Sequence, residues 1–214
     1  AYAYAVNTDE KMGNDKKLGY VPGRVSESLE YAYSDWCLSV LAEDLGCKEA
    51  AAEYFERSRS YSKVFDEEQG WFRPRNANGT WKEWPEEGRL KESYGCVESN
   101  LYQQGWFVPH DIPGMADLMG GRTKTLADLT NFFEKCPSDF LWNAYYNHAN
   151  EPVHHVPFLF NRLGAPWLTQ YWTRAICNGA YKNKVEGLVG NEDVGQMSAW
   201  YVLSAMRFHP VCPG

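Results

Sequence analysis

Residues 26–65 read SESLEYAYSDWCLSVLAEDLGCKEAAAEYFERSRSYSKVF, and this stretch decides the fold class. Ser26 begins a predicted helix, because glutamates follow it and apolar residues then recur every three to four positions. Gly46 ends that helix, and an alanine-rich second helix is expected over residues 48–65. Because the link between the two helices is short, we expect them to pack antiparallel.

On either side of this helix pair, the sequence predicts further helices and one hairpin. Residues 13–23 read as a polar turn region, and two short strands are expected at residues 70–75 and 80–84 around a glycine-containing turn. The other predicted helices cover residues 97–104, 111–119, 123–135, 153–163, 166–181 and 194–206. Successive helix pairs favour an all-α array over a doubly wound α/β fold. Since no repeat of fixed period is visible, a closed (α/α) barrel is expected rather than a solenoid.

Composition excludes several classes of protein. The 214 residues are 44% hydrophobic, which suits one substantial core, so a single domain is expected over residues 1–214. The net charge is -7 and the charges are interleaved, so no basic stripe indicates a nucleic-acid partner. No run reaches the roughly 18 apolar residues that cross a bilayer, so no membrane partner is expected.

The ends of the sequence and its cysteines bear on cellular context. The chain begins at Ala1 without Met and stops abruptly, so we expect an excerpt of a longer polypeptide. Its six cysteines form no CxxC pair, which argues against a zinc or thioredoxin-type site. A sequon at Asn78 would be usable only in a secretory compartment, and a secreted or periplasmic location is expected.

Aromatic residues make up 15% of the chain, which suits a surface that stacks on sugar rings or, alternatively, an aromatic-rich core. The first candidate segment places Asp35 beside Trp36 in the first predicted helix. An unpaired carboxylate is costly to bury, so Asp35 suits a core only if its charge has a partner. A turn that leads into an aromatic core helix is the alternative for this segment.

A second segment, residues 94–111, gathers a carboxylate, amides and aromatic side chains around a short helix. Glu98, Gln103 and Trp106 are expected to line a polar pocket. A carboxylic acid held against aromatic surface has a raised pKa, so it can keep a proton for a leaving group near neutrality. Glu98 as a solvated surface residue is the alternative.

A third segment, residues 147–155, contains three histidines and a carboxylate. The spacing is not HExxH, and the adjacent His154 and His155 point in different directions on a helix, which disfavours zinc. Oxygen donors from Asn150 and Glu151 suit a hard cation such as calcium, and the histidines can donate hydrogen bonds to hydroxyl groups.

A fourth segment, residues 189–201, places two carboxylates between glycines at a predicted helix start. Asp193 has a simple alternative role, since Asp at a helix N-terminus accepts backbone hydrogen bonds. Together with Glu98, however, it supplies two carboxyl groups from separate segments. Glycoside hydrolysis requires such a pair, because one group protonates the departing oxygen and the other activates water.

Together the four segments resemble glycoside hydrolase family 92, over residues 19–214. The motifs that carry the resemblance are Gly19-Tyr20-Val21-Pro22, Leu29-Glu30-Tyr31-Ala32-Tyr33, Trp106-Phe107-Val108-Pro109-His110-Asp111, Asn150-Glu151-Pro152, His154-His155 and Gly195-Gln196-Met197-Ser198-Ala199-Trp200-Tyr201. The resemblance implies an (α/α)6 barrel that follows a β-sandwich domain. It also implies that this chain is a portion of the barrel, whose partners are the sandwich and the other barrel helices of the same polypeptide.

The resemblance further implies an exo-acting α-mannosidase that acts on mannose-containing glycans with inversion and needs calcium. Glu98 is then the general acid and Asp193 the general base, with Asn191 holding the water. Asn150 and Glu151 lie near the calcium ion, which bridges O2 and O3 of the sugar and helps to distort its ring. The expected substrate-binding residues are Asp35, Trp36, Gln103, Trp106, His110, Asp111, His148, His154 and His155. Inversion predicts that the two carboxyl groups lie roughly 6.5 to 9.5 Å apart.

Departures from the family pattern leave the linkage preference open. The acid motif usually reads Glu-Gly-Asn, whereas this chain has Glu98-Ser99-Asn100. His148-Ala149 stands where members selective for α-1,2 links tend to carry His-Glu. A mannosyl-phosphate substrate is therefore an alternative. Two other classes stay open: a carbohydrate-binding or scaffold protein without turnover, and an (α/α)-barrel glycosidase that acts on glucans.

Overall fold

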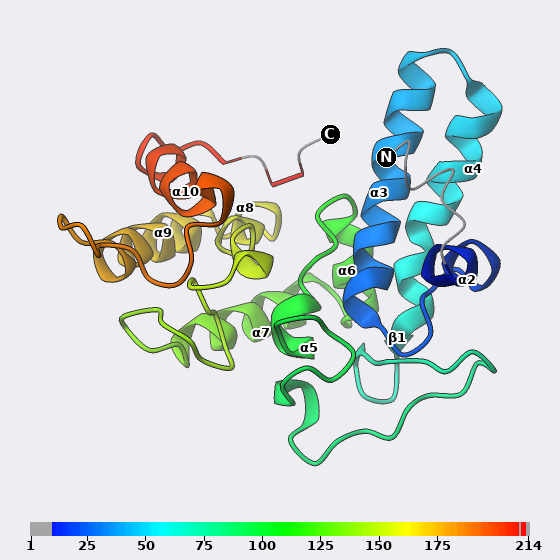
Figure 1. Cartoon of the computed structure of the whole chain (residues 1–214), viewed down its shortest axis with the longest axis horizontal. Coiled ribbons are helices and arrows are strands. Elements are labelled where there is room, and N and C mark those ends of the chain that lie inside the picture. The colour runs from blue at the N-terminus through cyan, green and yellow to red at the C-terminus, as the bar shows by residue number, and fades with distance from the viewer. Residues whose placement is uncertain (1–9, 210, 213–214) are drawn as a thin grey trace. The chain divides into compact units, whose positions relative to one another are not determined.

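The structure is a computed structural model that describes residues 10–209, 211 and 212 (Figure 1). The chain divides into two compact units, one up to Asp111 and one from Ile112. The elements of unit 1 are α2 (Glu10–Leu18), α3 (Val25–Asp44), α4 (Lys48–Ser58), η1 (Arg59–Val64), β1 (Phe65–Asp66), β2 (Trp71–Phe72), η2 (Gly88–Leu90) and α5 (Leu101–Gln104). Those of unit 2 are α6 (Ile112–Leu118), α7 (Arg122–Glu134), η3 (Glu151–Val153), η4 (Val156–Phe158), α8 (Leu159–Arg162), α9 (Pro166–Ala180), η5 (Asp193–Gly195) and α10 (Gln196–Ala205). Within the described residues the fold is all-α apart from one two-stranded sheet, as predicted.

The helices α3 and α4 form the pair that the sequence predicts, and they lie side by side in Figure 1. α3 ends in a Schellman motif, in which the N–H of Gly46 donates to Glu43 O (2.9 Å) and the N–H of Cys47 donates to Ala42 O (2.8 Å). Gly46 has a φ of +75°, a left-handed conformation that glycine adopts without steric cost. The motif satisfies carbonyl groups at the helix end and turns the chain into α4.

The second helix of this pair is shorter than expected. α4 ends at Ser58, and residues 59–64 form the 3-10 helix η1. The Ser58 hydroxyl donates to the carbonyl of Phe55 (2.6 Å), a local bond that competes with regular helix geometry. Phe65, predicted to be the last helical residue, instead begins β1 and packs edge-on against Phe72, with ring centroids 5.3 Å apart.

The hairpin pairs differently from the prediction. β2 lies inside the first predicted strand, but it pairs with β1, so that Phe65 faces Phe72 and Asp66 faces Trp71. The predicted partner at residues 80–84 contributes a single bridge between Arg75 and Trp81. Proline has no N–H to donate, and Pro74 therefore only accepts, from Lys82 N (2.9 Å).

Two further differences lie in unit 1. α2 occupies residues that were expected to form a polar turn. Residues 97–100, predicted as helical, are not, because Glu98 has a φ of +53° and Asn100 is the N-cap of the four-residue helix α5.

In unit 2, the helices α6, α7 and α9 follow their predicted ranges to within about one residue. The helix expected at residues 153–163 is broken into η3, η4 and α8, since a proline stands in the first turn of η3 and of η4. α10 begins after Gly195 rather than at Val194, because Val194 has a left-handed φ of +57°.

Each unit has its own aromatic core. In unit 1, Trp71 and Trp106 pack edge-on with ring centroids 5.1 Å apart. Gly105 permits this contact, because a Cβ there would lie 2.7 Å from the Trp71 ring. In unit 2, Phe133 stacks on Tyr146 with ring centroids 4.6 Å apart. None of the helices among the described residues has both the length and the apolar character to span a bilayer.

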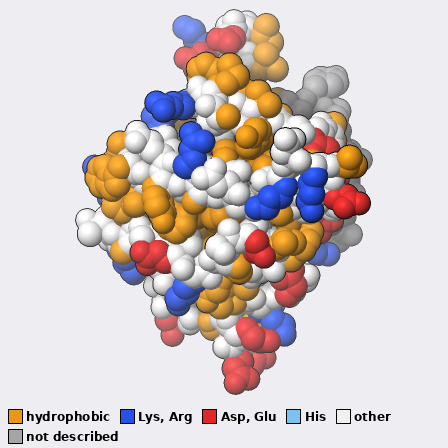
Figure 2. All heavy atoms as spheres, turned by 90° about the vertical axis from the view of Figure 1, so that its left-hand side faces the viewer, with side chains coloured by type: hydrophobic (Ala, Val, Ile, Leu, Met, Phe, Trp, Pro, Cys, Tyr) orange, Lys and Arg blue, Asp and Glu red, His pale blue; other side chains and the backbone are white. Residues whose placement is uncertain are grey.

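Unit 2 also exposes large apolar side chains. Trp167 and Tyr171 of α9 are each 62% exposed, and Val202 of α10 is 53% exposed. Figure 2 views the molecule from the side on which α9 and α10 lie in Figure 1, and it shows hydrophobic side chains spread across that face. Large apolar side chains with such exposed fractions suit a face that contacts other protein.

Candidate active site

In unit 1, the structure brings the first and second candidate segments together. The N–H of Val25, at the start of α3, donates to the carbonyl of Gly95 (2.6 Å). The N–H of Val97 donates to the Ser26 hydroxyl (3.2 Å). These bonds fix the loop that carries Glu98 against the N-terminal end of α3.

Glu98 lies on an exposed and strained part of this loop. Its φ of +53° is in the left-handed region, which glutamate adopts at an energetic cost. The residues after it are buried, since Ser99 is 1% exposed and Asn100 is 0% exposed. The loop therefore presents the Glu98 carboxyl group from a well-anchored backbone.

Three residues predicted to bind substrate are engaged inside unit 1. Asp35 is buried, and its Oδ1 lies 3.0 Å from Nη2 of Arg57, so it has the charged partner that a core carboxylate needs. Gln103 completes a capping box with Asn100, accepting from its N–H (3.2 Å) while donating its own N–H to the Asn100 side chain (2.9 Å). Trp106 is completely buried in the aromatic core. These three side chains hold α3 and the Glu98 loop in place.

Trp36, His110 and Asp111 are only partly buried. The His110 ring lies 6.3 Å from the Trp36 ring, centroid to centroid, and its Nε2 is 2.9 Å from Ser58 O. Since a carbonyl only accepts, Nε2 carries the proton, which leaves Nδ1 as an acceptor with no hydrogen bond in the described part of the chain. Burial lowers the pKa of His110, against the opposing effect of the Ser58 carbonyl. Asp111 accepts from the Tyr61 hydroxyl (2.7 Å).

In unit 2, the third and fourth candidate segments contact each other. Gly190 lies so close to Ala149 that a Cβ at Gly190 would be 2.2 Å from the Ala149 carbonyl oxygen. Nε1 of Trp200, in α10, donates to His154 O (2.8 Å), and Nε2 of Gln196 lies 3.3 Å from His154 Nδ1. The residues on both sides of η3 are thereby fixed to α10 and to the loop that precedes it.

The three histidines of the third segment, predicted to bind substrate, are buried. His148, His154 and His155 are 0%, 3% and 8% exposed. Burial lowers the pKa of His148 well below its ordinary value, and burial lowers the pKa of His154 to about 4. At neutral pH these two imidazoles are therefore uncharged, and they serve as hydrogen-bonding groups.

Asn191 and Asp193 are exposed and precede α10, with Asn191 on a loop and Asp193 at the start of η5. The N-cap of α10 is Gly195, without a side-chain bond, and the N–H of Ser198 in the first turn donates to Glu192 Oε1 (3.3 Å). Glu192, whose role the sequence interpretation missed, thus supports this helix start in place of Asp193. Its position beside the predicted helix N-terminus was the available signal.

Asn150 and Glu151 have the donor chemistry that calcium prefers. Asn150 is 7% exposed, and the Oε1 atom of the partly buried Glu151 is shielded from solvent. Within the described residues, no three His, Cys, Asp or Glu side chains are grouped to hold a metal ion. Calcium takes six to eight oxygen ligands, so an ion beside these two residues would draw the others from carbonyl groups, water or substrate.

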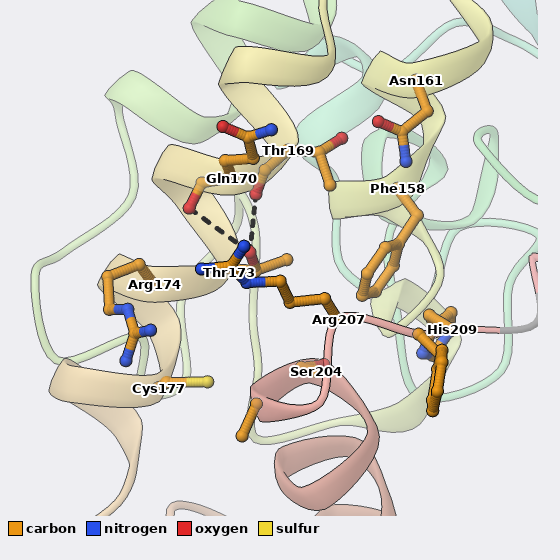
Figure 3. A pocket seen from close by; sticks show the side chains of 12 residues that line it. Phe158, Asn161, Thr169, Gln170, Thr173, Arg174, Cys177, Ser204, Arg207 and His209 are labelled. Atoms are coloured by element: carbon orange, nitrogen blue, oxygen red, sulfur yellow. Dashed lines mark hydrogen bonds between the residues drawn. The ribbon is translucent and has the colours of Figure 1, made fainter.

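A separate cavity of about 690 Å³ lies in unit 2 (Figure 3). Its lining residues are Phe158, Asn161, Thr169, Gln170, Thr173, Arg174, Cys177, Ser204, Ala205, Arg207, Phe208 and His209. The lining contains no carboxylate, so this cavity does not supply an acid and base pair. None of the residues predicted for the active site lines it.

The candidate carboxylates are thus placed on two anchored and exposed segments, Glu98 in unit 1 and Asp193 in unit 2. Their separation of roughly 6.5 to 9.5 Å stays a prediction. A pair of carboxylates on separate segments is what a glycoside hydrolase catalytic domain requires. Residues 2–214 match the family model of the glycosyl hydrolase family 92 catalytic domain, so the chain belongs to that family, as its motifs predicted.

Solved structures of this family are similar to the chain. A family 92 α-mannosidase from Bacteroides thetaiotaomicron, in complex with mannoimidazole, is 31% identical over 98% of this chain and 30% of that chain, with a TM-score of 0.87. An inverting mannosidase of family 92 from the same organism is 32% identical over 95% of this chain and 30% of that chain, with a TM-score of 0.85. These matches confirm the predicted fold class, because family 92 structures contain the (α/α)6 barrel.

A curated relative from Arthroderma benhamiae is named an uncharacterized secreted glycosidase. It is 27% identical over 230 residues, which cover 91% of this chain and 28% of the relative. The chain therefore spans less than a third of the length of this relative and of the two mannosidases.

Proposed function

We propose that the protein releases terminal α-linked mannose from glycans as an exo-acting, inverting and calcium-dependent α-mannosidase. One observation carries the proposal: in a member of family 92, the exposed candidate carboxylates lie at or next to a left-handed backbone position. Glu98 has a positive φ itself, and Val194, which follows Asp193, has one too. Strained conformations persist only where surrounding structure enforces them, and they cluster at functional sites. The similar structures named as mannosidases support mannose as the sugar.

Two proton transfers follow from this assignment. Glu98 donates a proton to the departing glycosidic oxygen, and Asp193 takes a proton from the attacking water, which Asn191 helps to hold. Water attacks the anomeric carbon from the face opposite to the leaving group, so the configuration inverts. Inversion requires a gap of roughly 6.5 to 9.5 Å between the two carboxyl groups, so that the water fits between one of them and the sugar.

Asn150 and Glu151 would hold the calcium ion. When bound, the ion supplies positive charge that attracts two hydroxyl groups of the sugar. The loop before η3 and η3 itself carry these residues, and the partly accessible Trp36 offers a ring surface to the substrate. We also propose secretion or a periplasmic location, supported by the name of the secreted relative.

Glu98→Gln and Asp193→Asn test the proposal, because each keeps the size of the side chain and removes its proton chemistry. We expect kcat for a mannoside to fall by about 10²- to 10⁴-fold in each variant, while mannoside binding is kept. A chelator should abolish mannose release, and added calcium should restore it. Binding without turnover in the unaltered protein would identify a scaffold instead, and cleavage of glucosides but not mannosides would identify a glucan-active enzyme.

A further inference from the structure

His148 lies at the centre of a hydrogen-bonded chain that joins two loops of the candidate site. Its Nδ1 is 2.7 Å from the Tyr146 hydroxyl, and its Nε2 is 2.7 Å from the Tyr181 hydroxyl. The Tyr181 hydroxyl in turn donates to the carbonyl of Met197 in the first turn of α10 (3.0 Å). This series of hydrogen bonds therefore connects the loop of Asn150 to the helix that follows Asp193.

The number of protons on each group fixes the direction in which the hydrogen bonds of this chain are donated. A tyrosine hydroxyl has a single proton, and that of Tyr181 goes to the Met197 carbonyl, which only accepts. Tyr181 must then accept from Nε2–H of His148, so Nδ1 of His148 is bare and accepts from the Tyr146 hydroxyl. The geometry selects the neutral imidazole with its proton on Nε2.

The remaining polar atoms of His148 are also engaged. Its backbone N–H donates to Phe140 O (3.1 Å), and its carbonyl is 3.0 Å from Nε2 of His154. The side chain is 0% exposed, and its ring packs edge-on against Trp200, with centroids 4.4 Å apart. A sugar hydroxyl could reach this ring only by displacing a tyrosine.

Two other contacts act in parallel with this chain. The Trp200 Nε1 bond to His154 O and the tight approach of Gly190 to Ala149 hold the same two segments together. These segments carry the candidate catalytic and calcium-binding residues of unit 2: Asn150, Glu151, Asn191 and Asp193.

We infer that His148 is a positioning residue, which fixes the loop of Asn150 and Glu151 to the segment that carries Asp193. The inference rests on the proposed function, since that assigns the three residues their roles. His148 acts through them and does not itself contact the sugar. Groups that orient metal-binding residues typically cost about 10- to 100-fold in activity or metal affinity when they are replaced.

Four variants of the full-length protein test this role. His148→Leu removes both ring nitrogens, and Tyr181→Phe removes only the hydroxyl that links His148 to Met197. His148→Gln keeps one acceptor and one donor and serves as the conservative rescue. Thr169→Val is the matched control, because Thr169 is buried in the same unit and its hydroxyl donates to Pro157 O (2.8 Å), away from both loops.

We expect His148→Leu and Tyr181→Phe to lower kcat for a mannoside about 10- to 100-fold, with little change in KM, and to weaken calcium binding measured by titration calorimetry. His148→Gln should recover most of the kcat, and Thr169→Val should keep both values. An unchanged kcat and calcium affinity in His148→Leu, corrected for the folded fraction, would overturn the inference. So would a rise in KM alone, which would indicate direct contact with substrate. If His148→Leu does not fold, Tyr181→Phe decides.

Hydrogen exchange separates this inference from the proposed function. Amides at residues 149–151 and 190–196 should exchange faster in His148→Leu and in Tyr181→Phe, but not in Thr169→Val. This readout needs no activity, so it still decides the role of His148 if the unaltered protein proves inactive on mannosides. Unchanged amide exchange in both His148→Leu and Tyr181→Phe would contradict the inference.

Discussion

At the scale of single residues, Arg57 shows how the molecule keeps a buried charge. Its guanidinium lies 3.0 Å from Asp35 and 3.9 Å from Asp15, and both carboxylates are almost completely buried. Arg57 therefore compensates charge that α3 and α2 place inside unit 1.

Arg57→Met should destabilise the protein by about 3–5 kcal/mol, because it leaves buried carboxylates without their cation. Urea unfolding followed by circular dichroism measures this loss. Lys91→Met is the control, since the Lys91 pair with Glu87 (2.7 Å) is on the surface, and its removal should change stability little. Equal effects of the two substitutions would contradict the assignment.

His110 should make stability depend on pH. Burial lowers its pKa in the folded state, whereas the unfolded chain has the ordinary value of about 6.5. As the pH falls below about 6.5, the unfolded chain binds a proton that the folded chain does not, so stability is lost on acidification and is unaffected above that pH. Unfolding free energies at pH 7.5 and pH 5.5 should differ less in His110→Gln than in the unaltered protein. The same pH dependence in both would show that His110 does not contribute.

The candidate residues differ in how far the sequence could assign them. That Asp35 needs a charged partner followed from the cost of burying a carboxylate. The identity of the partner, Arg57, could not be predicted, because Arg57 lies on a different helix and only the packing of the two helices brings it to Asp35. The pattern of Asn100 and Gln103 is a capping box that the sequence already contained, and it accounts for Gln103 without substrate.

At the scale of elements, replacing two helix-associated glycines by alanine should change stability in opposite directions. Gly46→Ala should destabilise the protein by about 1 kcal/mol, because alanine resists the left-handed conformation that ends α3. Gly13→Ala should stabilise α2 by about 0.5–1 kcal/mol, since Gly13 lies inside that helix and a Cβ there meets nothing within 4 Å. Thermal unfolding of both variants checks the signs. A loss of similar size in both would refute the Schellman assignment.

The elements also show why some predictions failed. The helix α3 was predicted well because its apolar residues recur at helical spacing and Gly46 marks its end. The helix α2, EKMGNDKKL, has few apolar residues and an internal glycine, so its sequence carries little helical signal. The hairpin was assigned the wrong partner, since Phe65 was placed at the end of the preceding helix and only the segment after β2 was left as a partner strand.

At the scale of the whole molecule, exposed apolar residues bear on how the chain behaves alone. Trp142 is 56% exposed, and α9 and α10 each expose further large apolar side chains. Relatives of the family are more than three times as long as the stretch they share with this chain.

Residues 1–214 made by themselves should therefore have little activity and a tendency to self-associate. Light scattering and mannose release measure both properties, with a longer polypeptide that includes these residues as the comparison. Hydrolysis by the isolated stretch at a rate comparable with that of a full-length relative would show this expectation to be wrong.

The backbone at Glu98 has a consequence for how such an enzyme evolves. Asparagine and glycine adopt its left-handed φ more readily than glutamate does, so either would relax the chain at this point. Neither can donate the proton that we assign to this position. Selection for heat resistance therefore favours replacing Glu98, whereas selection for turnover favours keeping it. In a lineage that no longer needs catalysis, this position is expected to be among the first to change.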